Sequence, residues 1–159
     1  MLFAATVLLQ DGHGLTPLQA GLAFLPLTLP TAVGPVFTAR LVAAHGPRLP
    51  VLTGLVALVT GPALLAASPT APYSVLGAGL LVIGVGVSLT LPALVTVVVA
   101  AAPPGTAGTA SGLLNAVRQT GATLGIAVMG TLPGGPAFLC AAVICGAAML
   151  LWVLSSRRG

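Results

Sequence analysis

Charged residues are nearly absent from this sequence. Lysine and glutamate do not occur, the single acid is Asp11, and arginine occurs five times in 159 residues. Charged residues therefore make up 4% of the chain, whereas a soluble domain holds about 25%. Hydrophobic residues make up 57%. A chain of this composition cannot form a water-exposed surface over a whole domain, so the sequence predicts an all-α integral membrane protein.

Groups that could hold a metal, a cofactor or a nucleic acid are also scarce. Cys140 and Cys145 lie five positions apart in an apolar segment, which is not a metal-ligand spacing, so we expect them to pack as small apolar residues. The sequence has no phosphate-binding loop. The arginines form no basic stripe with interleaved aromatic residues. We therefore expect no metal, no cofactor and no nucleic-acid partner.

An enzyme is one alternative. Ser111 could act as the nucleophile of an intramembrane serine protease, a chemistry that needs a base within hydrogen-bond reach. The two histidines of the chain, His13 and His45, are expected in loops on opposite sides of the membrane. The sequence therefore does not favour an enzyme.

Six apolar segments, separated by short polar or proline-rich breaks, are predicted to cross or enter the membrane. They amount to about five full transmembrane helices plus a partial first one, in a single membrane domain over residues 1–159: residues 1–10 (partial), 17–42, 51–67, 73–102, 108–132 and 137–154. Small residues in the segment 73–102 predict close contact with neighbouring helices: Gly77, Gly79, Gly84, Gly86 and Ser88.

Several prolines fall inside these segments. Proline removes a backbone donor from a helix, so we expect kinks or hinges at four positions: Pro26, Pro30, Pro35 and Pro92. The first three should kink one helix over residues 17–42, and a loop over residues 45–50 should follow it.

The arginines predict the orientation of the chain. Arg40 and Arg48 flank the loop after the segment 17–42, and Arg157 and Arg158 follow the last segment. The loops expected on the other side hold no basic residue. Because basic residues concentrate in cytoplasmic loops, we expect a multi-pass protein of the plasma membrane with a cytoplasmic C-terminus.

The segment 108–132 combines the length of a span with a polar face. On a helix its small and polar residues fall on one side, and Leu113, Val117, Leu124 and Val128 fall on the other, which suits lipid. The small and polar side suits protein or a water-filled path. The candidate pathway-lining or coupling residues are Ser111, Asn115, Arg118 and Gln119, and the candidate helix-packing residues are Gly108, Gly112, Gly121 and Gly125.

Two roles stay open for the polar residues of this segment. A guanidinium in the membrane costs at least about 2.5–3.5 kcal/mol on insertion scales, so Arg118 needs a polar environment. Arg118 is then either a pathway residue or a structural residue that caps carbonyls or reaches the cytoplasmic interface. Asn115 and Gln119 could contact a substrate or form hydrogen bonds between helices.

Three stretches give the sequence a resemblance to a known family. They are GTASGLLNAVRQTGATLGIAVMGTL over residues 108–132, LTPLQAGLAFLPLTLPTAVGPVFTARL over residues 15–41, and Gly46-Pro47-Arg48. In this order they resemble the C-terminal portion of the major facilitator superfamily, most closely its drug/proton antiporter branch with fourteen spans. The first stretch is similar to the second-to-last helix of those exporters, including an Arg-Gln-x-Gly core at residues 118–121.

The resemblance is incomplete in the loop that carries Gly46 and Arg48. The family motif there reads Gly-x-x-x-Asp-Arg-x-Gly-x-Arg, and this sequence has alanine at residues 39, 43 and 44. In the family this loop is thought to gate the cytoplasmic side through charge pairs. The resemblance therefore implies that gating by this loop is weakened or displaced.

The resemblance implies a secondary transporter that exports small amphipathic compounds by proton antiport. The family fold has two six-helix halves with the substrate site between them, so this chain would be a C-terminal half-bundle and a fragment. It would work in the lipid bilayer with an N-terminal half or a second copy. That partner would supply the coupling carboxylate, because no acid lies in any expected span. The alternative is a transport-inactive membrane remnant or an interaction module.

Overall fold

The computed structural model describes residues 17–67, 73–132 and 135–156. Every regular element in these ranges is an α-helix, which confirms the all-α class. The helices are α2 (Pro17–Ala23), α3 (Leu25–His45), α4 (Arg48–Ala67), α5 (Tyr73–Ala101), α6 (Ala107–Gly130) and α7 (Gly135–Ser156). The expected segment 1–10 and the residue His13 lie outside the described residues.

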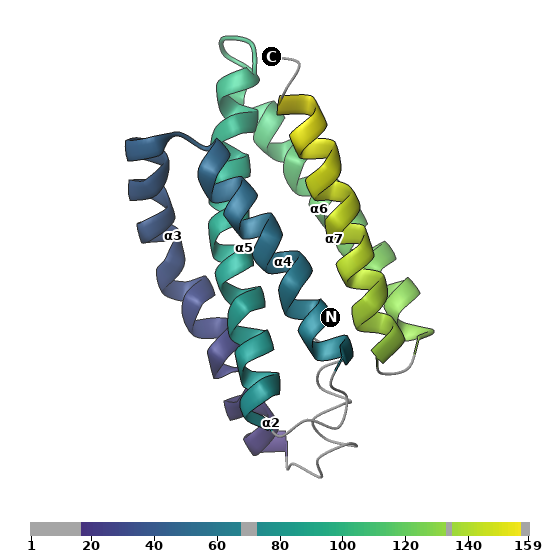
Figure 1. Ribbon diagram of the computed structural model, residues 1–159. Coiled ribbons are helices and arrows are strands. Elements are labelled where there is room, and N and C mark those ends of the chain that lie inside the picture. The colour runs from purple at the N-terminus through teal and green to yellow at the C-terminus, as the bar shows by residue number, and fades with distance from the viewer. Residues whose placement is uncertain (1–16, 68–72, 133–134, 157–159) are drawn as a thin grey trace.

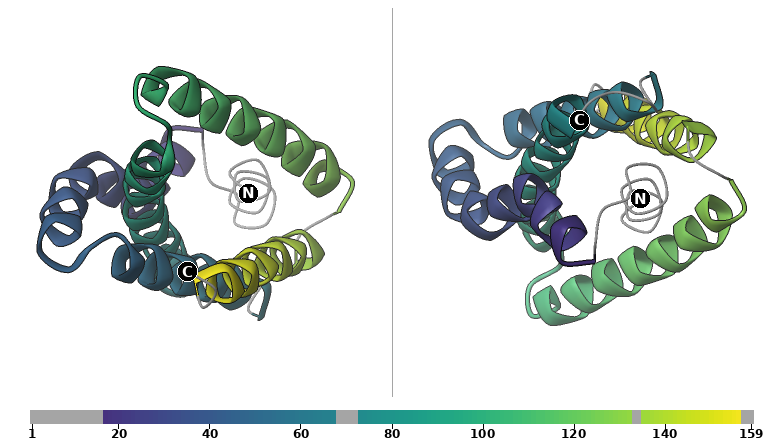
Figure 2. Two further views of the ribbon diagram at one scale, coloured as in Figure 1. Left: turned by 90° about the horizontal axis from the view of Figure 1, so that it is seen from above. Right: turned by 90° about the horizontal axis from the view of Figure 1, so that it is seen from below.

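Four helices pack side by side in the order α3, α5, α4 and α7 (Figure 1). The order in space differs from the order in sequence, because α5 lies between α3 and α4. Helix α6 stands apart from this row and approaches α5 and α7 mainly near its ends (Figure 2). The described residues therefore form a packed row of helices with one further helix beside it.

The helices of the row are the ones suited to a bilayer. Helices α3, α4, α5 and α7 are each long and apolar enough to cross a membrane, and their outward side chains contact lipid. Helix α6 has 24 residues, which is the length of a span, but Asn115, Arg118 and Gln119 lower its hydropathy. That α6 crosses the membrane stays a prediction.

The segment expected as one kinked helix over residues 17–42 is two helices. Helix α2 ends at Ala23, and α3 begins at Leu25 after a break at Phe24. Pro26 is the second residue of α3, where its missing N–H leaves no hydrogen bond unmade. Pro30 and Pro35 lie inside α3, which continues through both.

The loop expected over residues 45–50 is shorter than predicted. His45 is the last residue of α3, and α4 begins at Arg48, so only Gly46 and Pro47 lie between the two helices. Gly46 has a φ of +77°, a conformation that glycine adopts without steric cost, and its N–H donates to the carbonyl of Val42 at 2.9 Å. Pro50 does not end a loop but lies in the first turn of α4, where proline is tolerated.

Glycines bring α4 and α5 into backbone contact. A Cβ added at Gly61 would lie 2.6 Å from Cγ1 of Ile83, and one added at Gly86 would lie 2.9 Å from the carbonyl oxygen of Gly54. Helix α3 approaches α5 in the same way, since a Cβ on Gly84 would lie 3.0 Å from the Cα of Leu27. The close contact predicted for small residues of the segment 73–102 is therefore confirmed at Gly79, Gly84 and Gly86.

A threonine of α3 compensates for a proline of α5 where the two helices cross. Pro92 has no N–H, so the carbonyl of Ser88, four residues earlier, lacks its partner within α5. The hydroxyl of Thr38 on α3 donates to this carbonyl at 2.9 Å and lies 3.0 Å from the carbonyl of Gly34. Thr38 has no exposed surface. A side chain of one helix therefore satisfies a backbone group that proline leaves free in another.

Two apolar clusters hold the ends of the row together. One contains Leu65, Leu76, Leu80 and Phe138, from α4, α5 and α7. The other contains Val51, Leu55 and Ala93, from α4 and α5, with Trp152 of α7 packed against them. Helix α7 is thus joined to the row at both ends.

Replacing Gly84 with alanine should destabilise the row. Its Cβ would meet the backbone of Leu27, and overpacking of this kind costs about 1–3 kcal/mol of the free energy of unfolding. Gly112→Ala is the matched control, because a Cβ at Gly112 would meet no described atom within 4 Å. Unfolding by sodium dodecyl sulfate, followed by circular dichroism, measures both. A Gly84→Ala chain as stable as the Gly112→Ala chain would contradict the close approach of α3 and α5.

Replacing Thr38 with valine should leave the Ser88 carbonyl without a partner. Hydrogen bonds between membrane helices contribute about 0.6–1.7 kcal/mol, so we expect a loss of that size in the same unfolding measurement. Thr60→Val provides the comparison, because the exposed Thr60 hydroxyl donates to Val56 of its own helix, at 3.0 Å. Equal losses in the two variants would mean that the bond between α3 and α5 contributes nothing of its own.

Candidate functional site

Helix α6 carries the candidate pathway residues. It begins after a turn in which the N–H of Thr106 donates to the carbonyl of Pro103 at 3.0 Å. None of its residues is buried. Asn115, Arg118 and Gln119 are exposed, and Ser111 is half-buried. The structure therefore displays these polar side chains on a helix that stands apart from the packed row.

The polar side chains of α6 differ in how they are satisfied. The hydroxyls of Thr120 and Thr123 donate to carbonyls of their own helix, at 3.0 and 2.9 Å. Asn115, Arg118 and Gln119 have no side-chain hydrogen bond or ion pair with any other described residue. No carboxylate is present in the described ranges, because the one acid of the sequence, Asp11, lies outside them. These three side chains therefore remain free to bind groups from outside the described residues.

An apolar pocket of about 380 Å³ lies between α6 and α7. It is lined by Gly121, Leu124, Gly125, Val128 and Met129 of α6 and by Ala141, Ile144 and Cys145 of α7. Arg118 lies one helical turn before Gly121, on the same side of the helix. An apolar group could occupy this pocket with a polar end near Arg118.

The exposure of the side chains does not distinguish the lipid-facing side predicted for α6 from its polar side. Leu113 and Val117, expected to face lipid, are 66% and 62% exposed. Leu124 and Val128, expected on the same side, line the pocket. The side of α6 that meets lipid stays a prediction.

The candidate packing glycines of α6 lie in open space among the described residues. A Cβ added at Gly108, Gly112, Gly121 or Gly125 would meet none of their atoms within 4 Å. Helix packing at these four positions therefore stays a prediction that requires a partner from outside the described ranges.

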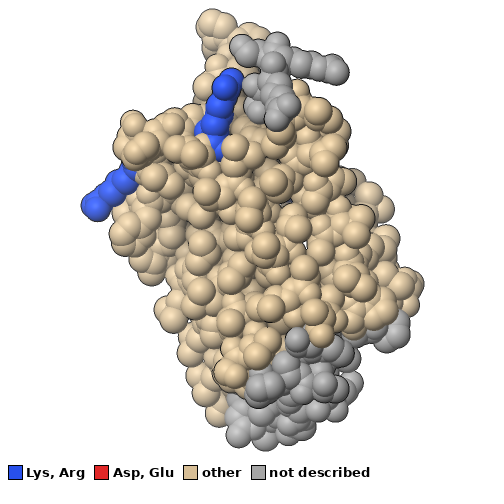
Figure 3. Space-filling view, in the orientation of Figure 1, with Lys and Arg blue, Asp and Glu red and all other residues tan. Residues whose placement is uncertain are grey.

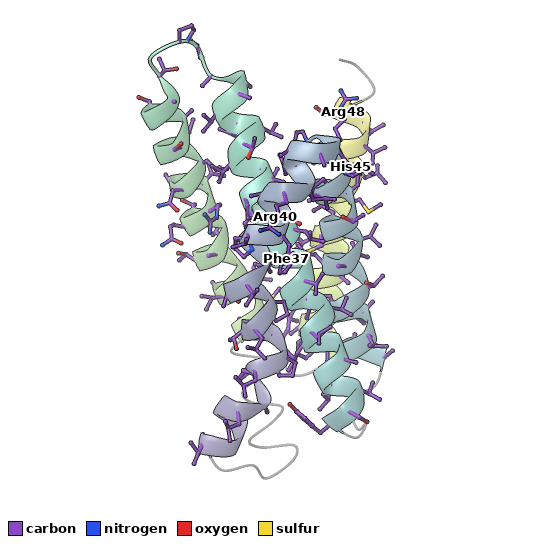
Figure 4. All side chains as sticks on the ribbon, turned by 90° about the vertical axis from the view of Figure 1, so that its left-hand side faces the viewer. Phe37, Arg40, His45 and Arg48 are labelled. Atoms are coloured by element: carbon purple, nitrogen blue, oxygen red, sulfur yellow. The ribbon has the colours of Figure 1, made fainter. Side chains whose placement is uncertain are left out.

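The candidate loop residues lie at one end of the row. Basic side chains of the visible face gather at this end (Figure 3). His45 and Arg48 lie on either side of the two-residue turn, with Arg40 further back along α3 (Figure 4). Arg48 is the first residue of α4 and is exposed. The structure does not bring Arg48 together with the candidate pathway residues of α6.

A cleft of about 240 Å³ adjoins Arg48. Pro47 and Arg48 at the start of α4, Val97 of α5, and Trp152 and Ser155 near the end of α7 line it. Nothing local to residue 152 in the sequence indicates contact with residue 48, so sequence reasoning does not find this cleft. Among the described residues no group of His, Cys, Asp and Glu side chains could hold a metal ion.

Known proteins resemble this chain over most of its length. It is 37% identical over 132 residues to the multidrug resistance protein Stp of Mycobacterium tuberculosis, which covers 83% of this chain and 25% of that protein. It is 36% identical over 123 residues to the drug efflux pump JefA of the same organism, which covers 77% of this chain and 24% of the pump.

A relative from Streptomyces glaucescens extends the pattern. The tetracenomycin C resistance and export protein is 34% identical over 134 residues, which cover 82% of this chain and 24% of that protein. The chain thus spans about a quarter of the length of these curated relatives. No solved structure matches it significantly. The Major Facilitator Superfamily matches residues 1–159, and the chain therefore belongs to this family of membrane transporters.

Proposed function

We propose that this chain forms one wall of the transport path in a secondary transporter that exports small amphipathic compounds. The observation that carries the proposal is α6, which holds exposed Asn115, Arg118 and Gln119 beside an apolar pocket. The names of three relatives support it, since each refers to drug resistance, efflux or export. We assign the chain to the drug/proton antiporter branch with fourteen spans on the resemblance of residues 15–41 and 108–132.

The chemistry of α6 suits an amphipathic substrate. Membrane pockets that bind such compounds hold the apolar body against apolar side chains and orient it with a few polar groups. Here the pocket offers Leu124, Val128 and Ile144 for the apolar body. Ser111, Asn115, Arg118 and Gln119 offer hydrogen bonds along the preceding turns of the helix.

Further helices are needed to complete this path. Polar side chains exposed to hydrocarbon are costly, so the polar face of α6 requires protein or water against it. In this family fold two halves enclose a site between them. We propose that an N-terminal half or a second copy of the chain covers α6, and that this partner supplies the carboxylate for proton coupling.

The experiment that tests the proposal is efflux of a fluorescent cationic dye. It compares cells that make the chain alone with cells that make it joined to the N-terminal half of a relative such as Stp, with membrane insertion verified in both. Export by the joined form supports a partner half, and export by the chain alone supports assembly of two copies. Export by neither contradicts the proposal and favours a transport-inactive remnant or an interaction module.

Arg118→Leu should reduce dye export roughly tenfold in whichever of these two proteins exports, the chain alone or the joined form. Membrane insertion should stay intact, because the substitution removes a charge from the path without shortening the helix. The rate of dye efflux at equal protein level measures this. Leu113→Ala is the control on the same helix, since Leu113 carries no polar group. Unchanged efflux by Arg118→Leu would make Arg118 a structural residue. Recovery with Arg118→Lys would show that the charge itself is needed.

We also propose that the C-terminus is cytoplasmic in the plasma membrane. Arg48 lies at the end of the row where α7 finishes, and Arg157 and Arg158 follow α7 in the sequence. Alkaline phosphatase fused after Arg158 should therefore be inactive, whereas green fluorescent protein at the same site should fluoresce. Phosphatase inserted within residues 68–72, between α4 and α5 in the sequence, is the control and should be active. The reverse pattern would overturn this orientation.

A further inference from the structure

The cleft at the start of α4 collects hydrogen-bond donors from two helices that are distant in sequence. Arg48 carries a guanidinium, Trp152 an indole N–H and Ser155 a hydroxyl, and all three residues line the cleft. The remaining lining, Pro47 and Val97, is apolar. A cleft lined by donors suits a ligand that accepts hydrogen bonds through several oxygens.

The indole N–H of Trp152 is buried and has no hydrogen-bond partner. Buried polar groups are nearly always paired, and an unmade bond costs free energy because the group has also lost its water. The indole can only donate, so it requires an acceptor. Trp152 also lines the cleft, so a rotation of the indole toward the cleft would let an acceptor there satisfy the N–H.

The charge of Arg48 is likewise unmatched. The one carboxylate side chain of the sequence, Asp11, is not among the described residues, so none of them offers Arg48 a side-chain anion. Arg48 also begins α4, where the aligned peptide dipoles add partial positive charge. The cleft therefore favours an anion, and the forked guanidinium matches the oxygens of a phosphate group.

The surroundings of the cleft indicate where such a phosphate comes from. Leu49, Leu151 and Leu154 are neighbours in sequence of the lining residues, and each is about half or more exposed. They present apolar surface beside the donors, which suits acyl chains. The cleft also lies at the end of membrane helices and contains a tryptophan, a residue enriched at the level of lipid headgroups.

We propose that this cleft binds the phosphate of an anionic glycerophospholipid. Arg48 pairs with the phosphate, Trp152 and Ser155 donate hydrogen bonds to its oxygens, and the acyl chains lie along Leu49 and Leu151. The site is separate from the pocket of α6 and does not depend on transport. The bound lipid joins the start of α4 to the end of α7, where Trp152 also packs against the cluster of Val51, Leu55 and Ala93.

The single tryptophan of the chain makes the site directly observable. Because Trp152 is the one tryptophan, all indole fluorescence reports on this cleft. The chain is placed in phosphatidylcholine nanodiscs that contain either dibrominated phosphatidylglycerol or dibrominated phosphatidylcholine in equal amount. Bromine quenches nearby indole, so phosphatidylglycerol should quench Trp152 at about fivefold lower mole fraction, the preference expected for one basic group near anionic lipid.

Arg48→Gln should abolish the difference between the two lipids. Arg40→Gln is the matched control, because it removes a charge from the same half of the row but does not line the cleft. Retention of the preference in Arg40→Gln and its loss in Arg48→Gln supports the site. Equal loss in both variants would overturn it, since the preference would then be a general attraction of the surface for anionic lipid.

A second arm separates lipid from soluble phosphate. Inorganic phosphate is titrated into phosphatidylcholine nanodiscs while Trp152 emission is recorded. No saturable change is expected, because free phosphate lacks the acyl chains that hold the lipid in place. A saturable change that Arg48→Gln removes would overturn the lipid assignment in favour of a soluble anion.

Discussion

A helix in a bilayer must find partners for its backbone groups inside the protein, and in α5 this constraint falls on the carbonyl of Ser88. Pro92 removes the donor that this carbonyl would have in an unbroken helix. Thr38 replaces the missing donor from α3, with no exposed surface of its own. The kink residue of one helix and the buried hydroxyl of another thus depend on each other. Glycines beside them allow α3 and α5 to come close enough for the bond.

The row of α3, α5, α4 and α7 and the separate helix α6 are built differently. In the row, backbones touch through Gly54, Gly61 and Gly86, and apolar side chains close both ends. Helix α6 has glycines too, but its chemistry lies in Asn115 and Arg118, which no described residue satisfies. The row is packed rigidly, as a scaffold requires. Helix α6 has side chains with unmade hydrogen bonds, as a binding surface requires.

Much of this arrangement follows from the sequence, and the exceptions have physical reasons. Hydropathy alone predicts the helical class, because five arginines and one acid cannot build a soluble surface. Proline is ambiguous locally, since it can kink a helix or begin one, and only the structure shows that Pro26 and Pro50 lie in first turns. The cleft of Arg48 and Trp152 could not be predicted, because it joins residues about a hundred positions apart. Helical periodicity predicts the polar face of α6. The sequence of α6 does not predict which protein surface covers that face.

The position of α5 between α3 and α4 has a consequence for how the chain assembles during synthesis. Helices α3 and α4 leave the ribosome before α5, joined by two residues, yet their glycine surfaces fit α5 rather than each other. A tight α3–α4 hairpin would have to open again to admit α5. Assembly therefore requires α3 and α4 either to remain unpaired or to separate again before α5 can take its place between them. The order of the helices along the chain thus differs from the order in which their surfaces fit together.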